Sequence, residues 1–204
     1  YAAITFNLSS DLANASNFLN IGGGSSNDTL TGDGNANVII GAGGDDTLNG
    51  GGGNDIIYGD DHLSDSSGTI YGIRSYGITD GNDTISGGDG DDTIYGGVGD
   101  DTLDGGTGKD IITTGSGLDK IYLRIGDGGY ALSDADIITD FTDGSDDFGL
   151  TTSLSFGDLT RTQGTGDYAN DTIIKYGSEY LAILQNIDDF SLLTEADFED
   201  VDIA

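Results

Sequence analysis

A period of nine residues is the strongest feature of this sequence, and it restricts the folds that the chain can adopt. Aliphatic residues recur at every ninth position from Leu12 to Ile57 and again from Ile85 to Ile121. Two positions before most of them stands an Asp, and glycines precede that Asp. A helix is excluded, because each Gly costs about 1 kcal/mol in a helix interior and the period is not a multiple of the helical repeat. The pattern predicts a β-solenoid of stacked turns and short strands.

Each repeat unit is expected to combine a six-residue Gly-rich turn with a three-residue strand. Residues 87–95 read GGDGDDTIY, and residues 96–104 read GGVGDDTLD. The strand spans about 10 Å, with its middle side chain pointing inward and the flanking two outward. Glycines permit positive φ in the turn, and their missing Cβ lets carbonyl oxygens converge. Carbonyl and carboxylate oxygens together suit Ca²⁺, so the turns are candidate metal sites.

The charge of the chain indicates a cation as partner and excludes several function classes. The sequence has 37 acidic residues, nearly all of them Asp, against six Lys and Arg, which gives a net charge of −31. Nucleic acid and anionic membrane surfaces are excluded as partners, because both require basic patches. No apolar run is long enough for membrane insertion. The absence of Cys excludes disulfides and thiolate metal sites.

The repeats match the pattern G-G-x-G-x-D-x-U-x, which is typical of a Ca²⁺-binding parallel β-helix. On these motifs the sequence resembles the RTX (hemolysin-type) calcium-binding family over residues 23–58 and 78–122, and it is similar to the C-terminal domain of serralysin-type proteases. The resemblance implies an all-β fold, a parallel β-roll of nonapeptide repeats with a C-terminal antiparallel β cap. It also implies that successive turns alternate between two edges, so that every second turn stacks and holds an ion.

The resemblance assigns the metal ligands to the sixth-position side chains and to the turn glycines. Asn37 is neutral, and Asn35 and Ser26 replace the fourth-position glycine, so we expect tighter binding in the second block. The expected pairs are Asp28 with Asp46, Asn37 with Asp55, Asp83 with Asp101, Asp92 with Asp110, and Asp101 with Asp119. The glycines expected at these sites are Gly24, Gly44, Gly51, Gly53, Gly81, Gly88, Gly90, Gly97, Gly99, Gly106, Gly108, Gly115 and Gly117.

The balance of burial against chain entropy predicts that folding depends on the metal. Each repeat buries one aliphatic side chain, which contributes about 1.5–3 kcal/mol. Ordering the backbone of a repeat costs roughly 1–2 kcal/mol for every residue. The free energy gained by burial is smaller than the entropy cost of ordering the repeat, and stacked carboxylates also repel one another. Several Ca²⁺ ions would reverse the sign of the electrostatic contribution, so the chain is expected to be disordered without them.

Five segments are expected along the chain. The period breaks at the insertion, where Asp60, Asp61 and Asp65 are expected to solvate the loop rather than to bind calcium. The tail from Leu192 is either a type I secretion signal, by resemblance, or a last short helix with Thr194 as its N-cap. The segments are an N-terminal capping coil (1–22), a first repeat block (23–58), an insertion loop (59–77), a second repeat block (78–122) and a C-terminal β cap (123–204).

No catalytic site is expected in this chain. The sequence contains neither H-E-x-x-H nor G-x-S-x-G, and its single histidine, His62, lies in the insertion. Acidic pairs such as Asp91-Asp92 follow from the repeat, whose fifth position is expected to point to solvent. Tyr58 and Tyr95 occupy the ninth position on the outer face and are not expected to stack in adjacent coils.

The function expected from the resemblance is that of a calcium-binding module. It would fold on Ca²⁺ outside the cell and support the secretion and folding of a larger secreted protein. Its partners would be calcium ions and the type I secretion machinery, and its location extracellular or at the cell surface. Two alternatives remain open. One is a surface-layer or adhesin module that binds other surface proteins, and the other is a polysaccharide-binding accessory module of a secreted enzyme.

Overall fold

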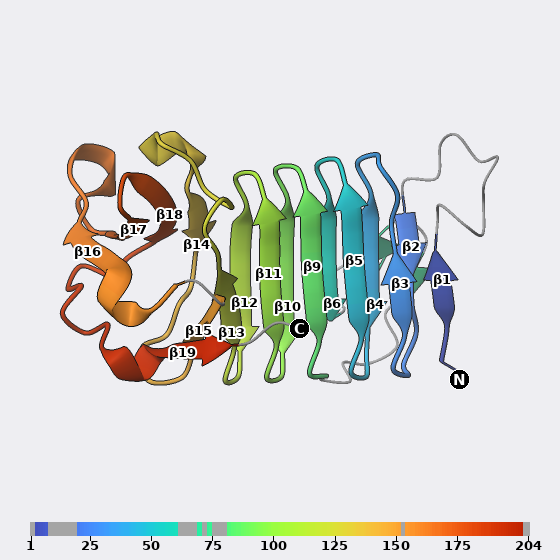
Figure 1. Cartoon of the computed structure of the whole chain (residues 1–204). Coiled ribbons are helices and arrows are strands. Elements are labelled where there is room, and N and C mark those ends of the chain that lie inside the picture. Colours follow the sequence, from blue (N-terminus) through green and yellow to red (C-terminus); the bar gives the residue numbers. More distant parts are fainter. Residues whose placement is uncertain are drawn as a thin grey trace.

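Two long β-sheets face each other in this computed structural model, and the chain winds between them (Figure 1). The structure describes residues 3–7, 20–60, 69–70, 73–74, 81–151 and 154–201. Successive strands of the repeat region alternate between the sheets, which we call sheet 1 and sheet 2. Sheet 1 contains, in spatial order, β1 (Thr5–Asn7), β3 (Thr29–Thr31), β5 (Thr47–Gly52), β9 (Thr84–Asp89), β11 (Thr102–Thr107), β13 (Lys120–Leu123), β15 (Asp147–Thr151) and β19 (Phe198–Val201).

Sheet 2 lies opposite and continues into the C-terminal part of the molecule. Its spatial order is β16 (Leu159–Gln163), β17 (Thr172–Tyr176), β18 (Glu179–Leu184), β14 (Asp136–Ile138), β12 (Ile111–Ser116), β10 (Thr93–Val98), β6 (Ile56–Asp60), β4 (Val38–Ala42) and β2 (Asn20–Gly22). Four short 3-10 helices complete the described ranges, which contain no α-helix: η1 (Leu132–Asp134), η2 (Phe156–Asp158), η3 (Gly166–Tyr168) and η4 (Glu195–Asp197).

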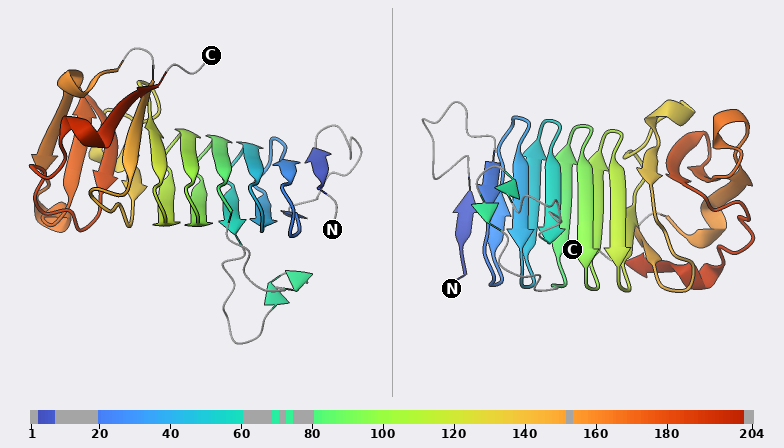
Figure 2. Two further views of the ribbon diagram at one scale, coloured as in Figure 1. Left: turned by 90° about the horizontal axis from the view of Figure 1, so that it is seen from below. Right: turned by 180° about the vertical axis from the view of Figure 1, so that it is seen from behind.

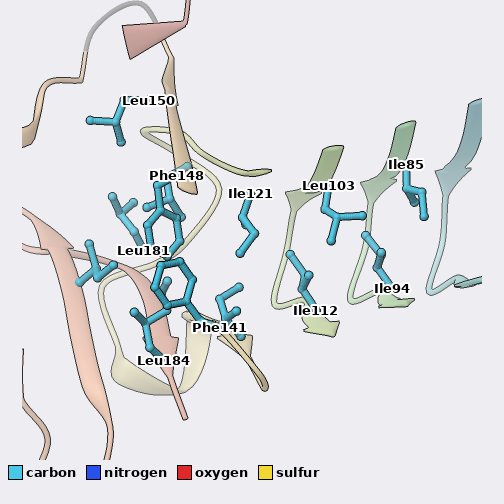
Figure 3. Packing of buried hydrophobic residues seen from close by; sticks show 14 of the residues in the cluster. Ile85, Ile94, Leu103, Ile112, Ile121, Phe141, Phe148, Leu150, Leu181 and Leu184 are labelled. Carbon is cyan, nitrogen blue, oxygen red and sulfur yellow. The ribbon is translucent and has the colours of Figure 1, made fainter. Parts of the chain in front are cut away.

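Within each sheet, the strands of the repeat region pair in parallel, one full coil apart. Leu30 of β3 lies in register with Leu48 of β5, and Ile94 of β10 with Ile112 of β12. The aliphatic residue of each repeat is almost fully buried, and the rows from the two sheets meet in one core (Figure 3). The predicted all-β fold and parallel β-roll are therefore confirmed. None of the helices in the described part of the chain has the length and apolar character needed to cross a membrane.

The two repeat blocks form one continuous solenoid. β5 pairs directly with β9, and β6 pairs directly with β10, so that Ile57 stacks on Ile94. Gly59 and Asp60 begin a turn that Gly81 resumes, which places the intervening residues at the third position of that single turn. Within this stretch, β7 (Thr69–Ile70) and β8 (Ile73–Arg74) form a small antiparallel sheet of their own (Figure 2).

The strands of the regular coils are longer than the sequence pattern predicts. β9, β10 and β11 each contain six residues, because the strand runs on through the glycines that begin the next unit. Gly97 lies in register with Gly115, so these glycines pair across coils like ordinary strand residues. Only Gly90, Asp91 and Asp92 remain between β9 and β10. The prediction of a three-residue strand and a six-residue turn was therefore wrong.

The C-terminal cap is antiparallel only in part. β16, β17 and β18 form the expected antiparallel meander. β14 and β15, however, pair in parallel with β12 and β13 and so add a further coil to the roll. β18 and β19 then pair in parallel with β14 and β15. Phe148 of β15 stacks between Phe141 and Phe198, which closes the core with aromatic rings instead of aliphatic side chains.

Residues near both ends of the chain cover the ends of the roll to different degrees. Within the N-terminal coil, Phe6 packs against the core, whereas Ile4 is 42% exposed. At the other end, the Thr194 side chain accepts a hydrogen bond from Ala196 N, which confirms it as a cap. The element that follows is the 3-10 helix η4, so the short helix considered from the sequence is present as a single 3-10 turn that leads into β19.

Ala42 provides a test of the turn geometry. It occupies the second position of its turn with φ of 88°, where Gly51 and Gly106 have φ of 100° and 98°. A non-glycine residue pays roughly 1–2 kcal/mol for a left-handed backbone. We therefore expect Ala42→Gly to raise the free energy of unfolding of the folded chain by about 1 kcal/mol, as measured by denaturant titration. The exposed Ala36, which lacks positive φ, is the control. An Ala42→Gly protein no more stable than Ala36→Gly would contradict the interpretation.

Candidate metal centre

Sixth-position side chains form a ladder along each edge of the roll. The backbone N–H of one sixth-position residue donates to Oδ1 of its equivalent in the next coil, at 2.8 Å from Asp92 to Asp110 and 2.9 Å from Asp101 to Asp119. The same bond crosses the insertion, from Asp46 N to Asp83 Oδ1 at 2.8 Å. The edge 1 ladder contains Asn37, Asp55, Asp92, Asp110 and Asp136, and the edge 2 ladder contains Asp28, Asp46, Asp83, Asp101, Asp119 and Asp146.

The second oxygen of most ladder carboxylates is buried without a hydrogen-bond partner. Asp92 and Asp110 are 1% and 0% exposed, so water does not reach their Oδ2 atoms. A buried carboxylate oxygen that receives no hydrogen bond costs free energy, and native structures rarely leave one in this state. Among the described residues, the ladder members with an unpartnered buried Oδ2 are Asp46, Asp55, Asp83, Asp92, Asp101, Asp110 and Asp119.

Burial disfavours the charged form of these carboxyl groups. Desolvation is the largest cause, and neighbouring carboxylates add to it, while the backbone hydrogen bond to Oδ1 acts in the opposite direction. In the absence of metal, these effects raise the pKa of Asp101 to about 8. They raise the pKa of Asp92 above its ordinary value, that of Asp119 to about 6, and the pKa of each of Asp46, Asp55, Asp83 and Asp110 to about 7.

First-position glycines bring carbonyl oxygens close to the unpartnered carboxylates. A Cβ on Gly87 would collide with both Asp92 Oδ2 and the carbonyl oxygen of Gly105 in the next coil. A Cβ on Gly50 would collide in the same way with Asp55 Oδ2 and the Gly87 carbonyl. The same arrangement recurs at further turns, so the Oδ2 atoms of five ladder residues lie near a carbonyl oxygen of the adjacent coil, in space that a side chain at the first position would fill: Asp46, Asp55, Asp83, Asp92 and Asp101.

The second- and fourth-position glycines also permit close stacking of the turns. A Cβ on Gly106 would collide with the Gly88 carbonyl oxygen, and one on Gly108 with the Gly90 carbonyl oxygen. Gly24 and Gly81 are the two members of the predicted set that lack positive φ. The positive φ expected of the set is found at Gly44, Gly51, Gly53, Gly88, Gly90, Gly97, Gly99, Gly106, Gly108, Gly115 and Gly117.

The donor atoms of the turns fit a hard divalent cation. Calcium takes six to eight oxygen ligands in flexible geometry, from carboxylates and backbone carbonyls alike. The turns offer unpartnered carboxylate oxygens and rows of carbonyls, with no nitrogen or sulfur ligand. In the described ranges no three acidic side chains converge on a common point, so backbone carbonyls would have to complete each coordination shell.

The first turn of each edge differs from those that follow. Asp28 Oδ2 accepts the Gly24 N–H at 2.6 Å, and Asn37 Oδ1 accepts the Asp33 N–H at 2.9 Å. These oxygens are satisfied within their own turn, unlike the Oδ2 atoms of the seven ladder carboxylates from Asp46 to Asp119. The sequence predicted a weak site at Asn37, and Ser26, which replaces the fourth-position glycine in the turn of Asp28, was part of the reason to expect weaker binding in the first block.

The fifth and ninth positions of the repeat point outward, and residues at these positions contact one another between neighbouring coils. The exposed fifth-position side chains form a second ladder, in which Asp91 Oδ1 accepts the Lys109 N–H and Asp100 Oδ1 accepts the Leu118 N–H. Tyr58 and Tyr95 stack, with ring centroids 4.9 Å apart. The expectation that these two rings do not stack was wrong, because the insertion is bypassed and β6 lies beside β10.

Sequence reasoning missed three buried aspartates next to the predicted sites. Asp136 and Asp146 extend the two ladders, and each stands two positions before a buried core residue, the same offset as in the repeats. That offset was the available signal. Asp60 was expected to solvate the insertion, but it is 5% exposed and its Oδ2 accepts the Val98 N–H at 2.7 Å. Asp61 and Asp65 lie outside the described residues.

Comparison with known proteins gives a matching family model and several similar solved structures. Residues 22–57, 78–112 and 98–128 match the family model of the RTX calcium-binding nonapeptide repeat. No curated relative matches the sequence. Among solved structures, a subunit of the mannuronan C5-epimerase of Azotobacter vinelandii is 24% identical, with a TM-score of 0.43 over 59% of this chain and 74% of that one. An extracellular lipase of Serratia marcescens is 17% identical, with a TM-score of 0.43 over 95% of this chain and 42% of the lipase.

The family description names Ca²⁺ as the cofactor, and the oxygen donors of the turns suit the same ion. The matched residues cover both repeat blocks and include the ladder aspartates from Asp28 to Asp119. The two repeat blocks of this chain therefore belong to the RTX calcium-binding nonapeptide repeat family, whose repeats bind several calcium ions.

Proposed function

We propose that this chain is a non-catalytic module that folds when it binds Ca²⁺ outside the cell and that supports the secretion and folding of a larger protein. One observation carries the proposal. Seven ladder aspartates hold a buried Oδ2 atom for which the described part of the chain supplies no hydrogen bond. A fold with such atoms needs a cation to be stable near neutral pH.

The ligands proposed for each ion come from two stacked turns on the same edge. They are the sixth-position carboxylates and the carbonyl oxygens that the glycines leave accessible, for example Asp92, Asp110 and the Gly105 carbonyl. Binding supplies the positive charge that these carboxylates lack, so the free energy of binding becomes free energy of folding.

Calcium concentration would then decide when the module folds. Extracellular calcium modules bind with Kd of about 10⁻⁴–10⁻³ M, which is suited to the calcium levels outside cells. Where calcium is scarce, the net charge of −31 and the buried carboxylates favour an open chain. An open chain is compatible with export, and the type I secretion machinery is the proposed partner at that stage.

Circular dichroism with and without calcium tests this proposal. We expect the spectrum of a disordered chain in excess chelator and a β-sheet spectrum in millimolar Ca²⁺, because the unneutralised ladders oppose folding. Mg²⁺ at the same concentration is the control for ionic strength. A chain with a β-sheet spectrum in excess chelator at pH 7.5 would disprove calcium-dependent folding.

The matched pair Asp101→Asn and Asp100→Asn tests the assigned ligands. Both variants lose one negative charge, but Asp101 is a buried ladder residue and Asp100 an exposed fifth-position residue. Asn at position 100 can still accept the Leu118 N–H. Loss of a charged ligand costs roughly 1–3 kcal/mol, so we expect the calcium midpoint of folding to rise about tenfold in Asp101→Asn. Equal midpoints for the two variants would remove Asp101 from the ligand set.

The pH dependence of the metal-free chain follows from the raised pKa values. The pKa of an Asp is about 4 in an unfolded chain, whereas burial raises the pKa of Asp83 to about 7 and that of Asp101 to about 8 in the fold. The folded form binds protons more tightly, so its stability is greatest below pH 4 and is lost as pH rises through 7–8. In chelator, we expect β-sheet signal to appear as pH falls from 8 to 5, with sedimentation to exclude aggregates. A signal that weakens on acidification would contradict the burial of these groups.

A further inference from the structure

The outer face of sheet 2 is apolar, although the chain as a whole is strongly acidic. The seventh- and ninth-position side chains of each repeat point away from the core, on either side of the buried eighth-position residue. The register of sheet 2 places these side chains in two rows across five neighbouring strands, from β4 to β14. The seventh-position row contains Val38, Ile56, Thr93, Ile111 and Ile137, and the ninth-position row contains Ile40, Tyr58, Tyr95, Thr113 and Thr139.

The same positions on sheet 1 are polar. Their strands, from β3 to β13, are stacked in the same parallel register. The residues are Thr29, Thr31, Thr47, Asn49, Thr84, Ser86, Thr102, Asp104, Lys120 and Tyr122. Seven of the ten residues on sheet 2 are aliphatic or aromatic, against one of the ten on sheet 1. The nonapeptide pattern leaves both positions unspecified, so the fold does not require this difference.

The apolar face of sheet 2 is exposed and free of charge. Its ten described residues include no charged side chain. Ile56 is 38% exposed and Ile111 is 39% exposed, and they lie on either side of Thr93 in one row. The acidic side chains of these coils lie in the turns, where Asp91 and Asp100 are exposed. A contiguous apolar surface with a charged rim is typical of a protein–protein contact.

The polar groups of this face do not suit a polysaccharide. Two of its three threonine hydroxyls, on Thr113 and Thr139, hydrogen-bond each other at 2.8 Å. The stacked rings of Tyr58 and Tyr95 each cover one face of the other. A sugar chain laid over the aliphatic rows would lose hydrogen bonds to water without gaining equivalent ones. The face is therefore matched by another apolar protein surface.

A second copy of this chain fits the face in charge and in area. Two chains with a net charge of −31 repel each other, and on the uncharged faces no carboxylates stand opposite one another. Five strands about 4.8 Å apart and about 20 Å long cover roughly 500 Å². Two such faces bury about 1,000 Å² together, which is the lower limit for a specific interface.

We propose that two copies of the calcium-bound chain associate through the outer faces of their sheets 2, related by a two-fold axis. In such an arrangement the same patch serves both partners, and the rows that contain Ile56 and Ile111 pack against those of the other copy. The rows exist only when the coils are stacked, so association follows the calcium-dependent folding proposed above. Sheet 1, with its polar outer face, stays in contact with solvent in the dimer.

Sedimentation equilibrium in millimolar Ca²⁺ tests the interface, with circular dichroism in parallel to establish that each protein is folded. We expect the unmodified chain to approach twice its monomer mass as its concentration rises from 1 to 200 μM. Ile111→Asp places a charge inside the interface, so we expect it to raise the dissociation constant more than tenfold. Thr84→Asp places the same charge at the equivalent exposed position of sheet 1 and is expected to leave the dissociation constant unchanged.

The outcomes separate this interface from the proposed function. A chain that folds in calcium but stays monomeric, or equal dissociation constants in the two variants, would overturn the interface and leave calcium-dependent folding standing. A chain that is already folded and dimeric in excess chelator would overturn calcium-dependent folding and leave the interface standing.

Deletion of residues 62–80 tests whether the insertion takes part. The deletion leaves Asp61 at the third position between Asp60 and Gly81, which gives a turn of regular length. All ten residues of the face remain, so we expect the shortened chain to dimerise as the unmodified chain does. Loss of the dimer on deletion would assign the contact to the insertion. A dimer that forms only after deletion would show that the insertion occupies the face, and either result would overturn the proposal.

Discussion

The structure depends on how each ladder carboxylate divides its two oxygens. In the seven ladder carboxylates from Asp46 to Asp119, Oδ1 accepts the backbone N–H of the preceding coil, which fixes the distance between coils, while Oδ2 is buried without a protein donor among the described residues. The hydrogen bond to Oδ1 holds neighbouring coils together, whereas the unpartnered, charged Oδ2 raises the free energy of the folded state at neutral pH. A calcium ion that binds the second oxygen removes the cost without disturbing the first. Structural order and metal content are therefore linked through a single side chain in each repeat.

The close stacking of the coils also requires glycine, because many positions in the turns have no room for a Cβ atom. Consecutive turns approach so closely that a Cβ on Gly88 or Gly106 would overlap a carbonyl oxygen of the neighbouring coil. The core contributes one aliphatic side chain per repeat, with Leu103 and Ile112 fully buried. This is a thin core, and it does not outweigh the entropy of so many glycines. The C-terminal cap is built differently, since Phe148 and its aromatic neighbours form a thicker core near the end of the roll.

Much of this architecture is readable from the sequence, because a strict period leaves few alternatives. The alternation of the turns, the parallel stacking and the row of ladder aspartates all follow from the period and the family pattern. Reasoning failed where the period breaks. The insertion enters one turn at its third position, so Tyr58 meets Tyr95 in spite of their separation in sequence. Asp136 and Asp146 stand 26 and 27 residues beyond their ladder partners instead of 18, which conceals them from a search for regular spacing.

The Oδ1 bonds all run the same way, and this gives the stack a direction. Every carboxylate accepts from the coil on its N-terminal side, as Asp110 does from Asp92 and Asp136 from Asp110. A coil that joins at the N-terminal side of a folded segment meets an acceptor already in place, whereas one that joins at the C-terminal side must supply its own. The aromatic cap offers a natural template at that C-terminal side. Assembly on such a template would advance from the residues synthesised last toward those synthesised first, against the order of translation.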